Sequence, residues 1–250
     1  KLVVYQMDGT EVRQISLVDT PNCLALLPNG GILLGMRDHV EEIDDEGAPK
    51  STWESLGAKA HITSITADEK NVYVADAGQR RVFCFNHNGK VIGQIGEKDE
   101  QRGIPGFVVP SPYFDVALDP QGALWVVNPG KHGLESYRPN GDLITSWYRP
   151  SMELKGFCGC CNPIHIAFRS DGSLVTAEKG ISRIKLYAPD QEFIGLVAGP
   201  DAFGERPEAG MAIDLESPLK DLAVDSKDRI LVLDSRQGSI RVFEEIKERS

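Results

Sequence analysis

The feature that most constrains this chain is a four-strand unit that recurs along it. It is clearest in FDVALDPQGALWVVNPGKHGLESYRPNGDLITSWY, which runs from Phe114 to Tyr148. Short apolar runs rich in Val, Leu, Trp and Tyr alternate there with turns that contain Pro, Gly, Asn and Asp, and this alternation is typical of strands joined by tight turns. The runs predict four strands: Asp115–Leu118, Leu124–Asn128, Leu134–Tyr137 and Leu143–Trp147.

The same unit recurs before and after that segment. Its other copies are Asn22–Leu56, Ile62–Gly96, Ile164–Gly199 and Leu219–Ile246, the last without a fourth strand. A four-stranded unit that repeats about every 40 to 55 residues predicts an all-β protein with the β-propeller fold. Because units run from end to end, we expect one domain over residues 1–250.

Residues 1–17 match the third and fourth strands of a unit. We therefore expect the N-terminal strands to close the terminal blade, since an open ring leaves unpaired strand edges. The predicted strands fit five blades with one strand to spare.

Composition excludes several classes of function. The formal charge of −10 and the pI of about 5.0 argue against nucleic-acid binding, which needs clustered Lys and Arg to neutralise phosphates. No apolar run is long enough to span a membrane. Residue 1 falls inside a strand-like run, so we expect that a leader has been removed.

The links between units differ in length. Val18–Pro21 and Gly57–His61 are short, whereas Glu97–Tyr113, Arg149–Pro163 and Pro200–Pro218 are long and rich in Pro, Gly and charge. In a propeller these links lie on one face, beside the mouth of the central channel. Long loops that closure does not require are common sites of function. The alternative is that they are packing insertions.

Two segments, VYVADAGQRRVFCFNHNGKVIGQIG and LAVDSKDRILVLDSRQGSIRVF, resemble the NHL repeat. In addition, GIPGFVVPSPYFDVALDPQGALWVVNPG, GFCGCCNPIHIAF and TAEKGISRIKLY resemble a group of uncharacterised bacterial NHL-repeat proteins, many with export signals. The resemblance implies a periplasmic or extracellular location. It also implies six blades, which we prefer to the five of the strand count. Because NHL rings include lyases and binding modules, the resemblance alone does not choose a function.

The starts of the five predicted first strands carry side chains that can bind metal. They are Cys23, His61, Asp115, His165 and Asp221. These starts converge on the channel, and four of them, His61, Asp115, His165 and Asp221, are candidate ligands for zinc or calcium. The alternative is a polar, water-filled channel. An NHL-type lyase holds zinc with histidines at such positions, and the resemblance implies a similar site here, although only two positions are His.

A second set of side chains lies at the ends of the second strands. Asp76 and Asp234 are expected to cap the turns that follow them. The positions occupied by Arg37, Asn128 and Glu178 depart from that pattern, and we predict that these residues contact a ligand.

The cysteines form a candidate cluster of their own. Cys158, Cys160 and Cys161 lie in one long loop, and Cys23 begins a strand. A disulfide staple, a zinc or iron–sulfur site and a redox-active dithiol are all possible for the cluster. A bridge between the adjacent Cys160 and Cys161 is unfavourable because it strains the peptide.

The sequence thus predicts a propeller that binds a small-molecule ligand or a protein partner on its loop-rich face. The alternative is a metal-dependent lyase or hydrolase at the same place, with the metal in the channel.

Overall fold

The computed structural model describes residues 1–204 and 217–245. The described chain is all-β, apart from the 3-10 helices η1 (Pro129–Lys131) and η2 (Pro200–Phe203). It divides into two compact units, Lys1–Ile95 and Gly96–Ser250. In its described part, no helix is long and apolar enough to cross a membrane.

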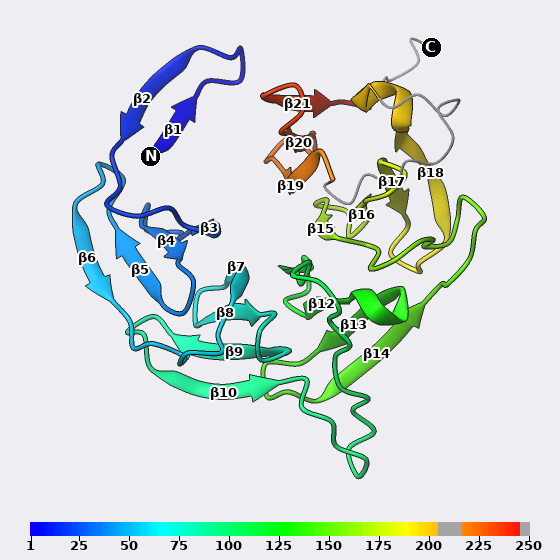
Figure 1. The fold of residues 1–250 in the computed structure, drawn as a ribbon, viewed down its shortest axis with the longest axis horizontal. Coiled ribbons are helices and arrows are strands. Elements are labelled where there is room, and N and C mark those ends of the chain that lie inside the picture. Colours follow the sequence, from blue (N-terminus) through cyan, green and yellow to red (C-terminus); the bar gives the residue numbers. More distant parts are fainter. Residues whose placement is uncertain (205–216, 246–250) are drawn as a thin grey trace. The chain divides into compact units, whose positions relative to one another are not determined.

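The first unit holds three antiparallel sheets (Figure 1). The N-terminal sheet pairs β1 (Leu2–Tyr5) with β2 (Glu11–Ile15). Two four-stranded sheets follow, each in sequence order: β3 (Cys23–Leu26), β4 (Ile32–Gly35), β5 (Val40–Ile43) and β6 (Pro49–Thr52), then β7 (Ile62–Ala67), β8 (Asn71–Asp76), β9 (Arg81–Asn86) and β10 (Val91–Ile95).

The second unit repeats the plan. Its two four-stranded sheets are β11 (Val116–Leu118), β12 (Leu124–Asn128), β13 (Gly133–Tyr137) and β14 (Leu143–Tyr148), then β15 (His165–Phe168), β16 (Leu174–Glu178), β17 (Arg183–Tyr187) and β18 (Phe193–Ala198). A three-stranded sheet follows, with β19 (Leu219–Val224), β20 (Ile230–Asp234) and β21 (Ser239–Phe243).

These sheets are the blades of a β-propeller, as the repeat predicts. The fold has five blades, so the preference for six was wrong. Among the described strands, four blades take four consecutive strands each, and the remaining strands form two separate sheets, β1–β2 and β19–β21. The described residues contain no strands for a sixth blade. The strand count alone indicated five, and the family resemblance was the misleading element.

Aspartate-led turns explain why the strands begin and end where they do. After β11, one oxygen of Asp119 accepts the amides of Gln121 and Ala123, each at 2.9 Å. Gly122 takes a positive φ of 80° there, a conformation that glycine adopts at little cost. Asp225 accepts two amides in the same way after β19. The turn motif therefore fixes the β11–β12 and β19–β20 hairpins locally.

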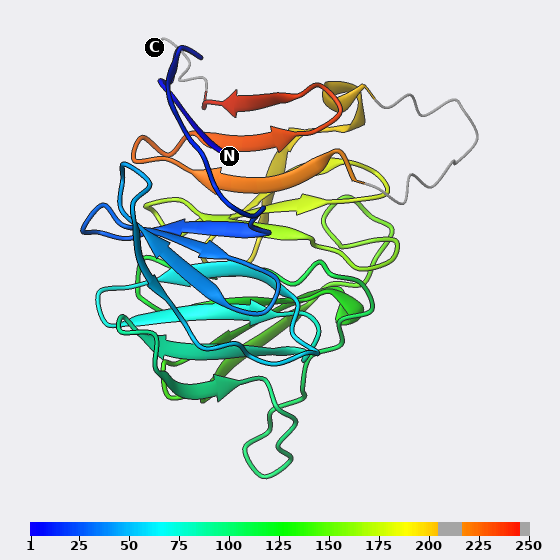
Figure 2. The same ribbon diagram turned by 60° about the vertical axis from the view of Figure 1, so that its left-hand side comes forward.

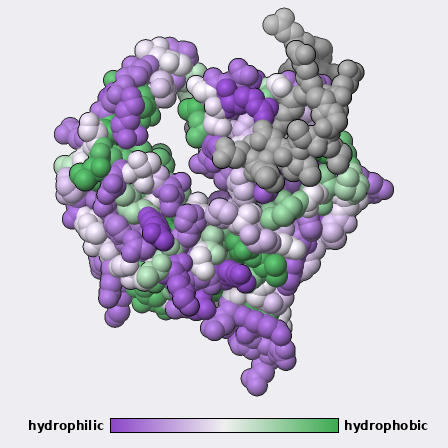
Figure 3. Space-filling model, viewed as in Figure 1, coloured by the Kyte–Doolittle hydropathy of each residue, from purple (hydrophilic) through white to green (hydrophobic). Residues whose placement is uncertain are grey.

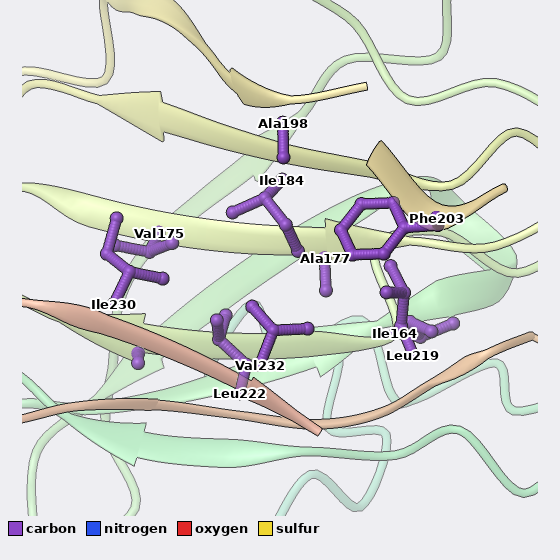
Figure 4. Close-up of a cluster of buried hydrophobic side chains, with 11 residues drawn as sticks. Ile164, Val175, Ala177, Ile184, Ala198, Phe203, Leu219, Leu222, Ile230 and Val232 are labelled. Atoms are coloured by element: carbon purple, nitrogen blue, oxygen red, sulfur yellow. The ribbon is translucent and has the colours of Figure 1, made fainter. Parts of the chain in front are cut away.

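Neighbouring blades of the second unit pack through flat apolar faces (Figure 4). Ile184 and Val175 of one blade face Ile230 and Val232 of the next, and all four are buried. Complete burial of such a side chain contributes about 1.5–3 kcal/mol. This packing sets the starts of β11, β15 and β19 side by side along the inner edge (Figure 1).

The long loops differ in how they meet the blades. Figure 2 shows part of the segment between β10 and β11 extending away from the strands of the β11–β14 blade, and Figure 3 shows that this protruding part is hydrophilic. The amide of Gly130 donates to the carbonyl of Val108 at 2.9 Å. His132 Nε2 and the carbonyl of Gly159 lie 2.6 Å apart. The first two long loops therefore both contact the β12–β13 turn. Of Pro200–Pro218, residues 205–216 lie outside the described residues.

Candidate binding site at the inner strand starts

Three of the predicted metal ligands meet at the inner edge of the second unit. His165 Nδ1 lies 3.6 Å from Asp115 Oδ2 and 3.9 Å from Asp221 Oδ1. The three residues come from the beginnings of three neighbouring inner strands. The blade packing therefore gathers an imidazole and two carboxylates that are far apart in the sequence.

The three side chains differ in exposure. Those of Asp115 and His165 are 11% and 16% exposed, whereas that of Asp221 is 66% exposed. The two oxygens of Asp115 accept the amides of Val116 and Ile166, at 2.9 and 2.8 Å. Asp115 is thus held in place and ties β11 to β15. Asp221 is the group that a ligand can reach.

The charges of the three groups influence each other. Burial lowers the pKa of His165, but the Asp115 and Asp221 carboxylates outweigh burial, so the pKa is raised above its usual 6.5. Loss of water around the carboxyl group and the like charge of Asp115 raise the pKa of Asp221 above its usual 3.8, and His165 and the amide of Leu222 oppose this rise. The two carboxylates therefore make this imidazole easier to protonate than that of a free histidine, and Lys220 opposes them.

The other two strand starts, Cys23 and His61, belong to the first unit. Cys23 begins β3, and His61 directly precedes β7, where its amide donates to Asp76 at 2.9 Å. Within residues 1–204 and 217–245, no three His, Cys, Asp or Glu side chains form a group that could hold a metal ion. The metal set of His61, Asp115, His165 and Asp221 stays a prediction.

The ends of the second strands are all buried apart from Arg37. Asp76 accepts the amide of Gln79 at 3.1 Å, and Asp234 accepts those of Arg236 and Gln237 at 3.0 and 3.1 Å. The predicted capping role of Asp76 and Asp234 is confirmed.

Arg37 is exposed and directly follows Met36, beyond β4 in the first unit. Its carbonyl accepts the amide of Ile62 at 2.9 Å. Because Arg37 is exposed, a ligand could reach it, and this contact stays a prediction.

Asn128 is fully buried and holds the first long loop. Its Oδ1 accepts the amide of Val108 at 2.9 Å, and its Nδ2 donates to the carbonyl of Gly106 at 3.2 Å and to Glu135 at 2.7 Å. Glu135 also accepts hydrogen bonds from the hydroxyls of Tyr137 and Tyr148. These contacts give Asn128 a structural role, and direct ligand contact by it stays a prediction.

Glu178 is likewise fully buried, where it forms an ion pair with Lys185. Burial raises the pKa of Glu178 and lowers that of Lys185, and each partner opposes the shift of the other. Lys185 Nζ also donates to the carbonyls of Leu154 and Gly156, at 3.1 and 2.7 Å. The pair therefore holds the second long loop. A ligand contact for Glu178 stays a prediction.

That second loop carries the cysteine cluster. Asn162 is fully buried and fixes the loop, because its amide group donates to the carbonyls of Cys158 and Lys179 at 2.7 and 2.9 Å. The Sγ atoms of Cys160 and Cys161 lie 2.9 Å apart. No disulfide joins the five cysteines, all of which the structure describes, and Cys84 is buried. The staple and the zinc or iron–sulfur site stay predictions.

Sequence reasoning missed Glu135 and Lys185. Each is the third residue of its strand, within GLESY and RIKLY, and alternation assigns such positions to solvent. A signal was available in the alignment of the repeats. Phe83 occupies the same position in β9, and an apolar residue there indicates that this position points inward.

The comparisons with known proteins concern the fold. No protein-family model matches this chain, and no curated protein matches it in sequence. Among solved structures, virginiamycin B lyase from Staphylococcus aureus is 14% identical with a TM-score of 0.61, over 98% of this chain and 78% of the lyase. A protein of unknown function from Bacteroides thetaiotaomicron is 13% identical with a TM-score of 0.67, over 96% of this chain and 63% of that one.

A third similar structure comes from a nidogen/laminin complex. It is 16% identical with a TM-score of 0.56, over 85% of this chain and 77% of that one. At such low identities the likeness shows the fold alone. A β-propeller is a scaffold suited to binding a protein or a ligand.

Proposed function

We propose that this chain is a binding module of the NHL-repeat type that recognises a positively charged group at the inner strand starts of its second unit. The group belongs either to a small molecule or to a side chain of a protein partner. The observation that carries the proposal is the exposed carboxylate of Asp221 beside the more buried His165 and Asp115.

Charge supports this choice of ligand. The chain has a formal charge of −10, which attracts cations and repels polyanions such as nucleic acid. Both oxygens of Asp115 accept backbone amides, whereas Asp221 accepts one, from Leu222 at 2.8 Å through Oδ1, and is the more exposed carboxylate, so it is the one placed to pair with a cation. The two anchored long loops border this part of the unit and would select the rest of the ligand. We also propose that the chain binds this ligand in the periplasm or outside the cell.

The test uses the imidazole signals of the five histidines in side-chain NMR spectra. A fragment library is prepared in matched cationic, neutral and anionic forms. We expect cationic fragments to shift the His165 signal, and the substitution Asp221→Asn to weaken that binding about tenfold or more, as loss of a charge-assisted contact does. Asp190→Asn is the matched control, because Asp190 is exposed in the turn between β17 and β18. Equal binding of anionic fragments, or no response at His165, would refute the proposal.

A second candidate is a metal-dependent lyase or hydrolase. The observation behind it is the proximity of His165 to two carboxylates, at 3.6 and 3.9 Å, although the described side chains do not form a metal-holding group as they stand. Two ligands at ~2 Å from one zinc ion lie roughly 3.3 Å apart. Asp115, His165 and Asp221 would hold the ion, with His61 as the further ligand that the sequence predicts. A bound zinc or calcium would supply Lewis-acid chemistry.

Elemental analysis separates the two candidates. The enzyme requires one divalent metal per chain in purified protein, and that metal should be lost in His165→Ala and kept in His87→Ala. The binding module predicts no stoichiometric metal and a cation-selective response at His165.

A further inference from the structure

The second long loop presents two adjacent thiols in contact. Cys160 Sγ and Cys161 Sγ lie 2.9 Å apart, with Cys160 exposed and Cys161 buried. Cys161 has a positive φ of 66°, and Gly159 one of 74°. A non-glycine residue rarely adopts this conformation unless its surroundings hold it there. The backbone on both sides of Cys160 thus turns the two side chains toward each other.

The loop around the pair is fixed at several points. Asn162 donates to the carbonyl of Cys158, and its own carbonyl oxygen accepts the amide of Lys179 at 2.9 Å. On the other side, Gly159 contacts His132 of the neighbouring blade. Because both flanks of the pair are anchored, the contact between the thiols is part of the folded loop.

The two thiols have different surroundings. Burial and the neighbouring Cys160 raise the pKa of Cys161, and Ser111 and Lys179 oppose this rise. The third cysteine of the loop, Cys158, is buried and contacts Arg183, with Nη1 3.7 Å from Sγ. Access therefore selects Cys160 as the thiol that meets a reagent first.

We propose that Cys160 and Cys161 form a dithiol–disulfide exchange site whose substrate is a low-molecular-weight disulfide such as glutathione disulfide. In the first step, the Cys160 thiolate attacks one sulfur of the substrate. A bond forms between Cys160 and that sulfur, the substrate's S–S bond breaks, and one thiolate leaves and takes up the proton that the Cys160 thiol has lost.

In the second step, Cys161 loses its proton and attacks Cys160 Sγ. The Cys160–Cys161 bond forms, the mixed disulfide breaks, and the second thiolate leaves and takes up the proton. Overall, the two protein thiols are oxidised and one substrate disulfide is reduced to two thiols.

Ring geometry makes the product suited to exchange rather than to stapling. Adjacent Cα atoms are about 3.8 Å apart across a trans peptide, whereas ordinary disulfides join Cα atoms about 5.5–6 Å apart. A bridge between neighbours is therefore strained and easily reduced again.

The experiment treats the reduced full chain with glutathione disulfide, blocks remaining thiols and analyses the tryptic peptide from Gly156 to Arg169. In the wild type, we expect this peptide to lose two hydrogens while Cys84 remains available for alkylation after unfolding. Cys158→Ser should behave like the wild type, and Cys160→Ser should form no disulfide.

The variant at Cys161 traps the first step. Cys161→Ser should stop with one glutathionyl group on Cys160, and Cys161→Ala is made beside it because Cys161 is buried. Near-UV circular dichroism checks that each variant is folded. A disulfide that still forms in folded Cys160→Ser, or a wild type whose Cys160 and Cys161 remain fully reduced, would overturn the proposal.

Discussion

Two blades of the second unit bury a charged side chain at the same place and satisfy it in different ways. In the β11–β14 blade, Glu135 accepts hydrogen bonds from three neutral donors, one of which is Asn128. In the β15–β18 blade, Lys185 pairs with the equally buried Glu178 and donates to loop carbonyls. Each network ends on a different long loop. The comparison shows that buried polar groups can determine where a surface loop lies.

The two networks should differ in what their loss costs. Neutral donors can rearrange around a changed acceptor, whereas an ion that loses its partner remains charged in a medium of low polarity. Lys185 lies 4.5 Å from the centre of the Phe157 ring and 5.5 Å from that of Tyr187, so few water molecules could replace its partner.

The largest effect is expected for Lys185→Met. It leaves buried Glu178 with only the more distant Arg183 as a cation, Nη1 3.8 Å from Oε2, so the free energy of unfolding should fall by about 3–5 kcal/mol. Urea denaturation measures the change. Adding Glu178→Leu should restore most of the loss, because the unpaired charge is then gone. Exposed Lys90→Met is the matched control and should cost about 0.5 kcal/mol or less. An equal loss in the single and double variants would contradict the buried ion pair.

A smaller effect is expected for Glu135→Gln. The substitution keeps the shape and weakens charge-assisted hydrogen bonds, so the cost should be about 1–3 kcal/mol in the same denaturation experiment. Exposed Glu46→Gln serves as the control. A cost as large as that of Lys185→Met would show that neutral donors do not adapt as the comparison requires.

The smallest effect is the pH dependence at His165. Its pKa is raised in the folded chain, so the folded state binds more protons than the unfolded state. The stabilisation is fully present below the usual pKa of 6.5 and is lost as pH rises through the folded pKa. Stability should therefore fall with rising pH in this range, and more weakly in His165→Gln. His87→Gln should keep the wild-type slope, and a wild-type slope in His165→Gln would remove His165 as its source.

The sequence was sufficient for the strands because each is bounded by a local signal. Turns such as that of Asp119 carry their own hydrogen bonds, so strand ends did not depend on distant contacts. The shared position of Asp115, His165 and Asp221 was also predictable, since it follows from aligning the repeats.

The loop anchors could not be predicted in the same way. Whether Glu135 or Lys185 points inward depends on partners from other strands and loops, which alternation along one strand does not contain. The contact of Cys160 with Cys161 depends on a positive φ at Cys161 that its residue type does not favour. The sequence indicated that a bridge between these two cysteines would strain the peptide. It did not indicate that the backbone already brings the two thiols into contact.

Hydrogen exchange with crossed variants tests most directly the claim that each network holds its own loop. Val108 donates its amide to Asn128 in the first loop, and Phe157 donates its amide to the carbonyl of Arg149 at 2.7 Å in the second. Under conditions where each variant stays folded, Glu135→Gln should speed exchange at Val108 and spare Phe157. The double variant Glu178→Leu with Lys185→Met should do the reverse. Equal acceleration of both amides in either variant would contradict separate anchoring.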